Sequence, residues 1–265
     1  TAAPGVNFFT AAWTRLLMTS IGIDLNVLGE ENLTAKRPAV FLFNHRNQAD
    51  PFIAGRLISD NFTSVGKKEL EKDPPLMGTV GRVLDAAFID RDDPKAAVES
   101  LAKIEELARK GISVLIAPEG TRLDTTEVGE FKKGGPFRIA MAAGVPLVPI
   151  VIRNAEVIAE RNSSTFNAGK VDVAVFPPIS VDDWTTENLS ERIAEVRQLY
   201  LDTLKDWPVD VLPSAPLYER TAAPPKKAPA KKAPAKEAAA KKVPAKKAPA
   251  KKAAAKAVPA KKGRP

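Results

Sequence analysis

The sequence predicts an α/β fold: a single domain with a central, largely parallel or mixed sheet flanked by helices, followed by a disordered Lys/Ala/Pro tail. Six apolar runs of strand length alternate with helical patterns, which favours β-α-β units packed into one sheet. About 210 residues precede the tail, enough to bury the core of one such domain. We expect an N-terminal amphipathic helix over 1–24, a folded domain over 25–212 and a tail over 213–265.

The first expected element is the amphipathic helix within residues 1–24. The apolar stripe along one face of this helix is typical of a helix that lies in a membrane interface. It is equally typical of a helix that packs on the domain's own core. Arg15 lies off the stripe. The stripe at helical spacing consists of Phe9, Trp13, Leu16 and Leu17, with Phe8 and Met18 beside it.

The strands and helices of the domain then follow in alternation. The clearest helix begins at Pro94 and ends near Lys110, with Asp92 or Asp93 as its N-cap and Gly111 as its stop. Its inward stripe is expected at Val98, Leu101, Ile104 and Leu107, and further helices are expected over 137–143 and 190–204. The expected strands cover 39–43, 62–65, 86–89, 112–117, 147–152 and 171–176.

The only histidine of the chain, His45, comes directly after the expected strand 39–43, and Asp50 follows it by five residues. Residues five apart do not face each other on one helix, so pairing these two requires a turn between strand and helix. Asp50 precedes Pro51 and is therefore expected to cap a helix whose first position is proline. Histidine suits proton transfer near neutral pH, and an oriented imidazole can take a proton from a hydroxyl. The alternative is a histidine that merely satisfies a turn.

Two other strand ends deliver arginines. Arg91 follows the run 86–89, and Glu119-Gly120-Thr121-Arg122 follows the run 112–117. Ligands of parallel sheets bind beyond the carboxyl ends of the strands, and arginine recognises phosphate through two parallel hydrogen bonds. Gly120 permits a tight turn that would direct Thr121 and Arg122 into a cleft. These segments predict an anion site, although each side chain taken singly fits a surface ion pair. Lys132 and Lys133 would add charge.

The net charge of +8 is divided unevenly along the chain. Residues 221–265 carry 14 lysines and Arg264 against Glu237, a net of +14, so the first 220 residues hold 25 basic and 31 acidic side chains, a net of −6. From Lys226 the tail repeats every five residues, mostly as KKAPA, with prolines that exclude a helix. Such an arm would bind an anionic membrane surface or, without sequence preference, a nucleic acid. The alternative is a solubilising tail without a partner.

Several function classes are excluded by composition. The chain has no cysteine, which rules out disulfides, a thiolate nucleophile and zinc–thiolate sites. No apolar run reaches the roughly 18 residues that a membrane-spanning helix needs, so no transmembrane segment is expected. The body also lacks a basic stripe with interleaved aromatic residues, which limits nucleic-acid binding to the tail.

The ordered motifs resemble those of the PlsC-type glycerolipid acyltransferases, the 1-acyl-glycerol-3-phosphate acyltransferase family. Asn44-His45 with Asp50 resembles the family's NHxxxxD motif. The match covers about residues 25–180, which would be the acyltransferase domain. One departure is Asn47, where the family often has serine. The segments that follow in the family's order are Gly66-Lys67-Lys68-Glu69-Leu70 with Pro75 and Gly78, Phe88-Ile89-Asp90-Arg91, Pro118-Glu119-Gly120-Thr121-Arg122, Phe131-Lys132-Lys133-Gly134 and Val145-Pro146-Leu147-Val148-Pro149.

The resemblance implies transfer of a fatty acyl group from acyl-CoA or acyl-carrier protein to the hydroxyl of 1-acyl-glycerol 3-phosphate (lysophosphatidic acid), giving phosphatidic acid. His45 would be the general base and Asp50 would orient it, with no metal or tightly held cofactor. The strand 145–149 would lie near the acyl chain or in the core. Glycerol 3-phosphate, another lysophospholipid or another alcohol are alternative acceptors. The enzyme would sit peripherally at the cytoplasmic face of an anionic membrane. The acceptor's phosphate and glycerol would be bound by Lys68, Arg91, Glu119, Gly120, Thr121 and Arg122.

Overall fold

The computed structural model describes residues 4–68, 86–89, 93–122, 127–131, 134–159 and 165–209. The chain divides into two units, Thr1–Thr221 and Ala222–Pro265, and every described residue belongs to the first. The predicted tail, Arg91 and the pair Lys132 and Lys133 lie outside the described residues. The same holds for the segment 69–78, which contains the part of the second family-like motif that follows Lys68.

A seven-stranded mixed sheet forms the centre of the domain, with the strand order β1-β7-β6-β2-β5-β3-β4. All neighbouring pairs are parallel except β6 with β7, so β1 and β7 run against the other five strands. This confirms the predicted fold class and all six expected strands. The strands are β1 (Ile23–Leu28), β2 (Val40–Phe43), β3 (Phe62–Lys67), β4 (Ala87–Ile89), β5 (Ser113–Ile116), β6 (Leu147–Arg153) and β7 (Gly169–Val175).

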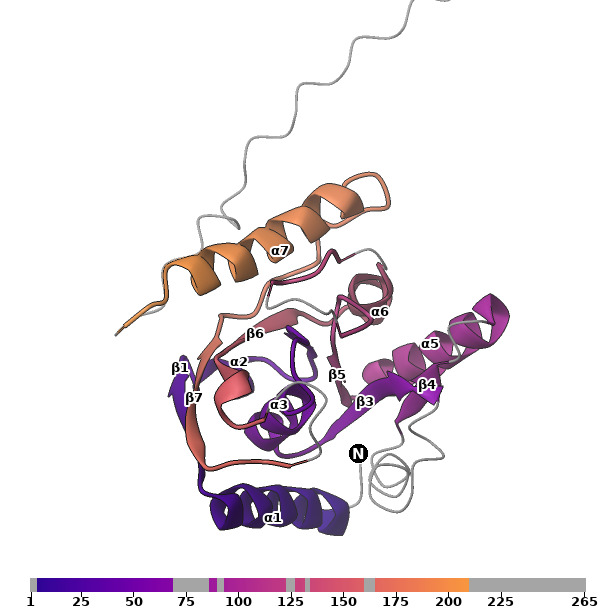
Figure 1. Ribbon diagram of the computed structural model, residues 1–265. Coiled ribbons are helices and arrows are strands. Elements are labelled where there is room, and N and C mark those ends of the chain that lie inside the picture. The colour runs from indigo at the N-terminus through magenta and orange to yellow at the C-terminus, as the bar shows by residue number, and fades with distance from the viewer. Residues whose placement is uncertain are drawn as a thin grey trace, which may run out of the picture. The chain divides into compact units, whose positions relative to one another are not determined.

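Helices cover both faces of this sheet (Figure 1). Parallel strands that are covered on both faces consist of nearly continuous apolar residues, and β2 is buried along its whole length. The helices are α1 (Pro4–Ile21), α2 (Asn32–Ala35), α3 (Asp50–Ile58), α5 (Pro94–Arg109), α6 (Gly135–Ala143), α7 (Leu189–Lys205) and the 3₁₀ turn η2 (Ala155–Val157). Val40 and Leu42 of β2 pack with α5, α6 and α7, whereas Phe41 and Phe43 pack with α1 and α3.

The N-terminal helix α1 lies against α3 and β1. Met18 is buried in the core cluster on that face of the sheet, so this end of α1 does pack on the domain. Leu16 points the other way and keeps 68% of its surface exposed. The side chains of Phe8, Phe9 and Trp13 lie outside the described part, so the alternative of a membrane interface stays a prediction for them. Among the residues that the structure describes, no helix has both the length and the apolar character to span a membrane.

Helix α5 shows where local sequence patterns succeed and where they fail. The side chain of Asp93 accepts hydrogen bonds from the amides of Lys95 and Ala96, which confirms the predicted N-cap. Gly111 follows the helix with a φ of +93°, as a helix stop requires. The predicted inward position of Val98 is wrong, because 66% of its surface is exposed. The first turns of α5 extend beyond the sheet, and Ile104 and Ala108 carry the buried contacts.

One strand escaped sequence analysis. Strand β1 pairs in parallel with β7 from Ile23 to Leu28, at the edge of the sheet. Asp24 and Asn26 alternate with half-buried apolar residues there, which is the pattern of a strand with one solvated face. The adjoining apolar stripe of α1 obscured this short alternation.

Candidate active site

The motif residues gather at one edge of the sheet because their strands are neighbours. Strands β2, β5, β3 and β4 are adjacent and parallel, so their carboxyl ends meet at the same edge. His45 follows β2, the segment 119–122 follows β5, and Lys68 directly follows β3. The structure therefore brings His45, Lys68 and the segment 119–122 to one edge of the sheet, and Arg91 lies outside the described ranges.

The loop between β2 and α3 turns His45 back onto Asp50. The imidazole Nδ1 lies 3.5 Å from Oδ2 of Asp50, whose side chain is only 2% exposed, while that of His45 is 23% exposed. The same Oδ2 accepts hydrogen bonds from the backbone amides of Arg46 at 2.7 Å and Asn47 at 2.5 Å. The turn that pairing required is thus present.

The predicted role of Asp50 as a helix cap is wrong. Helix α3 begins at Asp50 itself, Ala49 occupies the N-cap position, and no side chain caps the first turn. Pro51 stands in the first turn, where its missing N–H costs nothing. The Asp50 carboxylate instead reaches back over the preceding loop and accepts hydrogen bonds from two of its backbone amides. It holds the loop and the imidazole together.

This arrangement suits a histidine that acts as a base. If Nδ1–H is donated to the buried carboxylate, Nε2 is left with its lone pair for a substrate proton. A separation of 3.5 Å is long for a hydrogen bond, as is common before substrate tightens such a pair. The ring also packs at 5.7 Å from the ring of Phe43, which limits its rotation.

Two asparagines anchor the loop to the neighbouring strand β6 and to the segment that follows it. The Asn44 amide donates to the Ile152 carbonyl at 2.9 Å, and its oxygen accepts from the Ile152 amide at 2.7 Å. Asn47 donates to the Ala159 carbonyl and accepts from the Ala49 amide. Asn47, which stands where the family often has serine, thus connects the backbone of its own loop to the backbone at Ala159. Sequence analysis did not predict either of these anchoring contacts. The signal that could have indicated them is the presence of two asparagines, one on each side of the histidine.

Glu119 reaches His45 from the neighbouring strand. Its two carboxylate oxygens lie 3.2 and 3.3 Å from the backbone N–H of His45, which donates to them. Glu119 is 8% exposed, and burial raises the pKa of its carboxyl to about 7, although hydrogen bonds from its own amide and that of His45 act in the opposite direction. The spacing of the motif gives no hint of this contact with the histidine backbone.

The residues after Glu119 turn outward. Gly120 has a φ of +68° and donates its amide to the Ala117 carbonyl at 3.1 Å, which is the predicted tight turn. Thr121 is then exposed and Arg122 half-buried, and Lys68 is exposed beyond β3. These side chains have the access that an anion site needs, and their contact with a phosphate stays a prediction.

The strand near the expected acyl chain is part of the core. Val145, Leu147, Val148 and Ile150 are all buried, divided between the clusters on the two faces of the sheet. Of the two alternatives left open for residues 145–149, the structure supports the core.

Comparisons with known proteins agree with this geometry. Residues 24–153 match the family model described as Acyltransferase. The chain is 32% identical over 209 residues to the 1-acyl-sn-glycerol-3-phosphate acyltransferase of Saccharomyces cerevisiae, covering 78% of this chain and 66% of that protein. It is 30% identical over 201 residues to the enzyme of the same name from Cocos nucifera, covering 76% and 64%. The chain thus spans slightly less than two thirds of these relatives.

A solved structure is similar as well. The crystal structure of the 1-acyl-sn-glycerophosphate (LPA) acyltransferase PlsC from Thermotoga maritima superimposes with a TM-score of 0.63 at 25% identity, over 78% of this chain and 80% of that one. Sequence and fold therefore agree, and the chain belongs to the PlsC-type glycerolipid acyltransferase family.

Proposed function

We propose that the chain transfers a fatty acyl group from an acyl thioester to the free hydroxyl of 1-acyl-glycerol 3-phosphate, forming phosphatidic acid. Nε2 of His45 takes the proton of the hydroxyl as its oxygen attacks the thioester carbonyl carbon. The tetrahedral intermediate collapses, the C–S bond breaks, and the leaving thiolate takes the proton from the imidazolium. The step uses no metal, no bound cofactor and no covalent acyl-enzyme.

The observation that carries the proposal is the pairing of a partly exposed imidazole with a buried carboxylate. Asp50 is 2% exposed and is fixed by two backbone amides, so it can hold the His45 ring without itself reaching the substrate. A carboxylate in that position stabilises the imidazolium that forms during transfer. The names of the similar proteins from yeast, coconut and Thermotoga maritima support the acceptor.

The acceptor's phosphate would bind at the exposed ends of the neighbouring strands. Thr121 and Arg122 after β5 and Lys68 after β3 share the sheet edge with His45, and Arg91 belongs to the same set by sequence order. Arginine and lysine there would fix the headgroup and leave the free hydroxyl near the imidazole.

An acceptor and donor panel tests the proposal. The purified chain is supplied with acyl-CoA or acyl-carrier protein thioester and with lysophosphatidic acid, glycerol 3-phosphate, a lysophospholipid or a plain alcohol. We expect thiol release that depends on lysophosphatidic acid, with phosphatidic acid as product. Thiol release without any acceptor, or equal rates with alcohols that lack phosphate, would contradict the proposed substrate. The two thioesters identify the donor.

We further propose that the enzyme works peripherally on an anionic membrane. The exposed Leu16 of α1 and the net charge of +14 over residues 221–265 support this. Sedimentation with anionic and neutral vesicles tests it, with the full chain and with a chain lacking 222–265. We expect the full chain to bind anionic vesicles and the shortened chain to bind them more weakly. Equal binding by the two chains would show that the tail does not contribute to membrane binding. A parallel DNA titration measures the tail's alternative partner.

A further inference from the structure

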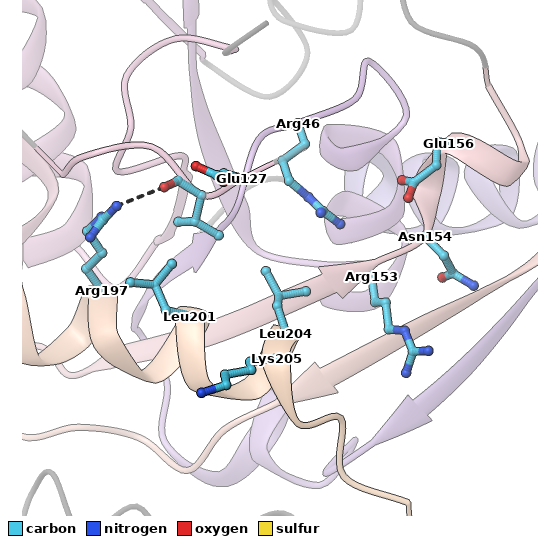
Figure 2. Close-up of a pocket in the computed structure, with 10 residues that line it drawn as sticks. Arg46, Glu127, Arg153, Asn154, Glu156, Arg197, Leu201, Leu204 and Lys205 are labelled. Carbon is cyan, nitrogen blue, oxygen red and sulfur yellow. Dashed lines mark hydrogen bonds between the residues drawn. The ribbon is translucent and has the colours of Figure 1, made fainter. Parts of the chain in front are cut away.

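We propose that a cavity behind the His45 loop, between α7, the end of β6 and Arg46, is a second anion site that binds a phosphorylated ligand. The cavity has a volume of about 630 Å³, within the usual range for small-molecule sites (Figure 2). No part of the family-like motifs other than the variable position Arg46 lines it. The inference is independent of the proposed acyl transfer.

The lining of the cavity is dominated by cations. Arg46, Arg153, Arg197 and Lys205 come from the loop after β2, from β6 and from α7, and all four line the cavity (Figure 2). Glu127 and Glu156 are the two carboxylates among the lining residues, so its ionisable groups carry a net charge of +2. Several arginine and lysine side chains around one cavity, with a surplus of positive charge, provide the chemistry that recognises phosphate.

Two of these arginines are held in place by neutral groups. Arg197 donates from Nε to the Gly129 carbonyl at 2.8 Å and from Nη2 to the Val128 carbonyl at 3.0 Å. Arg153 lies over the ring of Trp207, with its guanidinium carbon 5.3 Å from the ring centroid. Carbonyls and an aromatic face position a guanidinium without neutralising it, so both charges remain available to a ligand.

The lining of the cavity also includes apolar side chains. Leu201 and Leu204 of α7 line it beside the cations. A lining that combines cations with two leucines fits a ligand that carries both phosphate and a less polar part, such as the phosphorylated nucleotide end of a CoA thioester or a phosphorylated glycerol lipid. Phosphate is the chemistry that these sources share.

The cavity and the His45 site lie on opposite sides of one loop. The His45 ring packs against Phe43, which belongs to the cluster shared with α1 and α3. The neighbouring Arg46 points from its loop toward the side chains of α7, which packs on the other face of the sheet (Figure 2). Arg46 also donates to the Ile152 carbonyl, next to the Asn44 anchor. A ligand in the cavity would therefore contact the His45 loop on the side that faces α7, opposite the imidazole.

A binding titration tests this inference. Inorganic phosphate, glycerol 3-phosphate and adenosine 3′,5′-bisphosphate are each titrated into the full chain by calorimetry at fixed salt. Lys205→Gln removes an exposed cation at the end of α7, and Arg153→Gln combined with it removes two. The matched control is Lys36→Gln with Lys95→Gln, which removes two exposed lysines that do not line the cavity. All chains keep the tail, so its contribution is equal throughout.

We expect at least one of the three ligands to bind, with its Kd raised about threefold by Lys205→Gln and about tenfold or more by the double variant. The control should change Kd less than twofold, and thermal melting shows whether each variant is folded. The ligand that binds most tightly identifies the source of the phosphate. No binding by any of the three, or an equal loss in the control, overturns the inference. Repeating the titration in His45→Ala, where we expect the same Kd, separates this result from the test of acyl transfer.

Discussion

The loops that leave the adjacent strands β2 and β5 contribute to the same edge of the sheet but are built differently. The β2 loop, residues 44–49, is held by the Asp50 carboxylate and by the amides of Asn44 and Asn47, all of them buried. The β5 loop, residues 117–122, contains a backbone turn at Gly120 and the buried Glu119, and it reaches an exposed Thr121.

The difference matches the tasks that we assign to the two loops. A general base has to be placed within a few tenths of an ångström of the proton that it removes, which requires a rigid loop. A residue that recognises an incoming headgroup has to be reachable from solvent, which requires an open one. Because Glu119 binds the His45 backbone, the open loop also contributes to the rigidity of the closed one.

The largest effect is expected when the centre of the rigid loop is removed. Asp50→Ala leaves the amides of Arg46 and Asn47 without their acceptor and the imidazole without its orienting partner. We expect kcat/KM for acyl transfer to fall about 10³- to 10⁴-fold. Asp24→Ala, at an exposed carboxylate on β1, is the control and should leave activity unchanged. Activity of Asp50→Ala within threefold of the wild type would show that the loop does not depend on this carboxylate.

Asn44→Ala should lower stability rather than remove the base. The substitution breaks two buried hydrogen bonds between Asn44 and Ile152, and the backbone N–H of Ile152 loses the acceptor that Asn44 provides. We expect the free energy of unfolding to fall by about 2–4 kcal/mol, measured by urea denaturation. Asn26→Ala, which removes an exposed hydrogen bond to Asp172, should cost less than about 1 kcal/mol. Equal losses in the two variants would contradict the description of the β2 loop as the rigid one.

Glu119 links the two loops and should make stability depend on pH. Its carboxyl pKa is raised by burial from 4.5 to about 7, so between these values the folded chain binds the proton more tightly than the unfolded chain. This contribution to stability is therefore fully present below pH 4.5 and is lost as pH rises through about 7. Urea titrations from pH 4.5 to 8 in wild type and Glu119→Gln measure it. We expect the difference in unfolding free energy between the two chains to change by about 2–4 kcal/mol in favour of the variant at high pH. A difference that does not vary with pH would place the Glu119 pKa near its ordinary value.

The smallest effect on stability is expected in the open loop. Thr121→Ala changes an exposed side chain, so the free energy of unfolding should move by no more than about 0.5 kcal/mol. If Thr121 contacts the acceptor, KM for lysophosphatidic acid should rise a few-fold with little change in kcat, measured by steady-state assays. A destabilisation as large as that of Asn44→Ala would remove the contrast between the two loops.

The contrast also explains how much the sequence could predict. Apolar runs and helical spacing located six strands, the cap at Asp93 and the edge of the sheet where His45, Lys68 and Glu119 meet, because these features depend on short-range pattern and on the geometry of parallel sheets. The contacts of Asn44 with Ile152 and of Glu119 with the His45 amide join residues far apart in sequence. Local spacing carries no information on such pairs.

The same limit accounts for Asp50 and Arg46. The Asp-Pro pair predicts a helix start, and the start is present, but the carboxylate bonds backward to the loop rather than forward to the helix. The direction in which Arg46 points depends on the position of α7. This helix lies more than 140 residues further along the sequence, so local spacing could not predict that the two line the same cavity.

The most direct test of the account is the rate of acyl transfer by His45→Gln, a variant that keeps a polar side chain but cannot act as a base near neutral pH. The assay measures thiol release with lysophosphatidic acid as acceptor, for wild type and variant matched in melting temperature. We predict that kcat falls by at least about 10³-fold in the variant. Turnover at the wild-type rate by the folded variant would contradict general-base catalysis by His45.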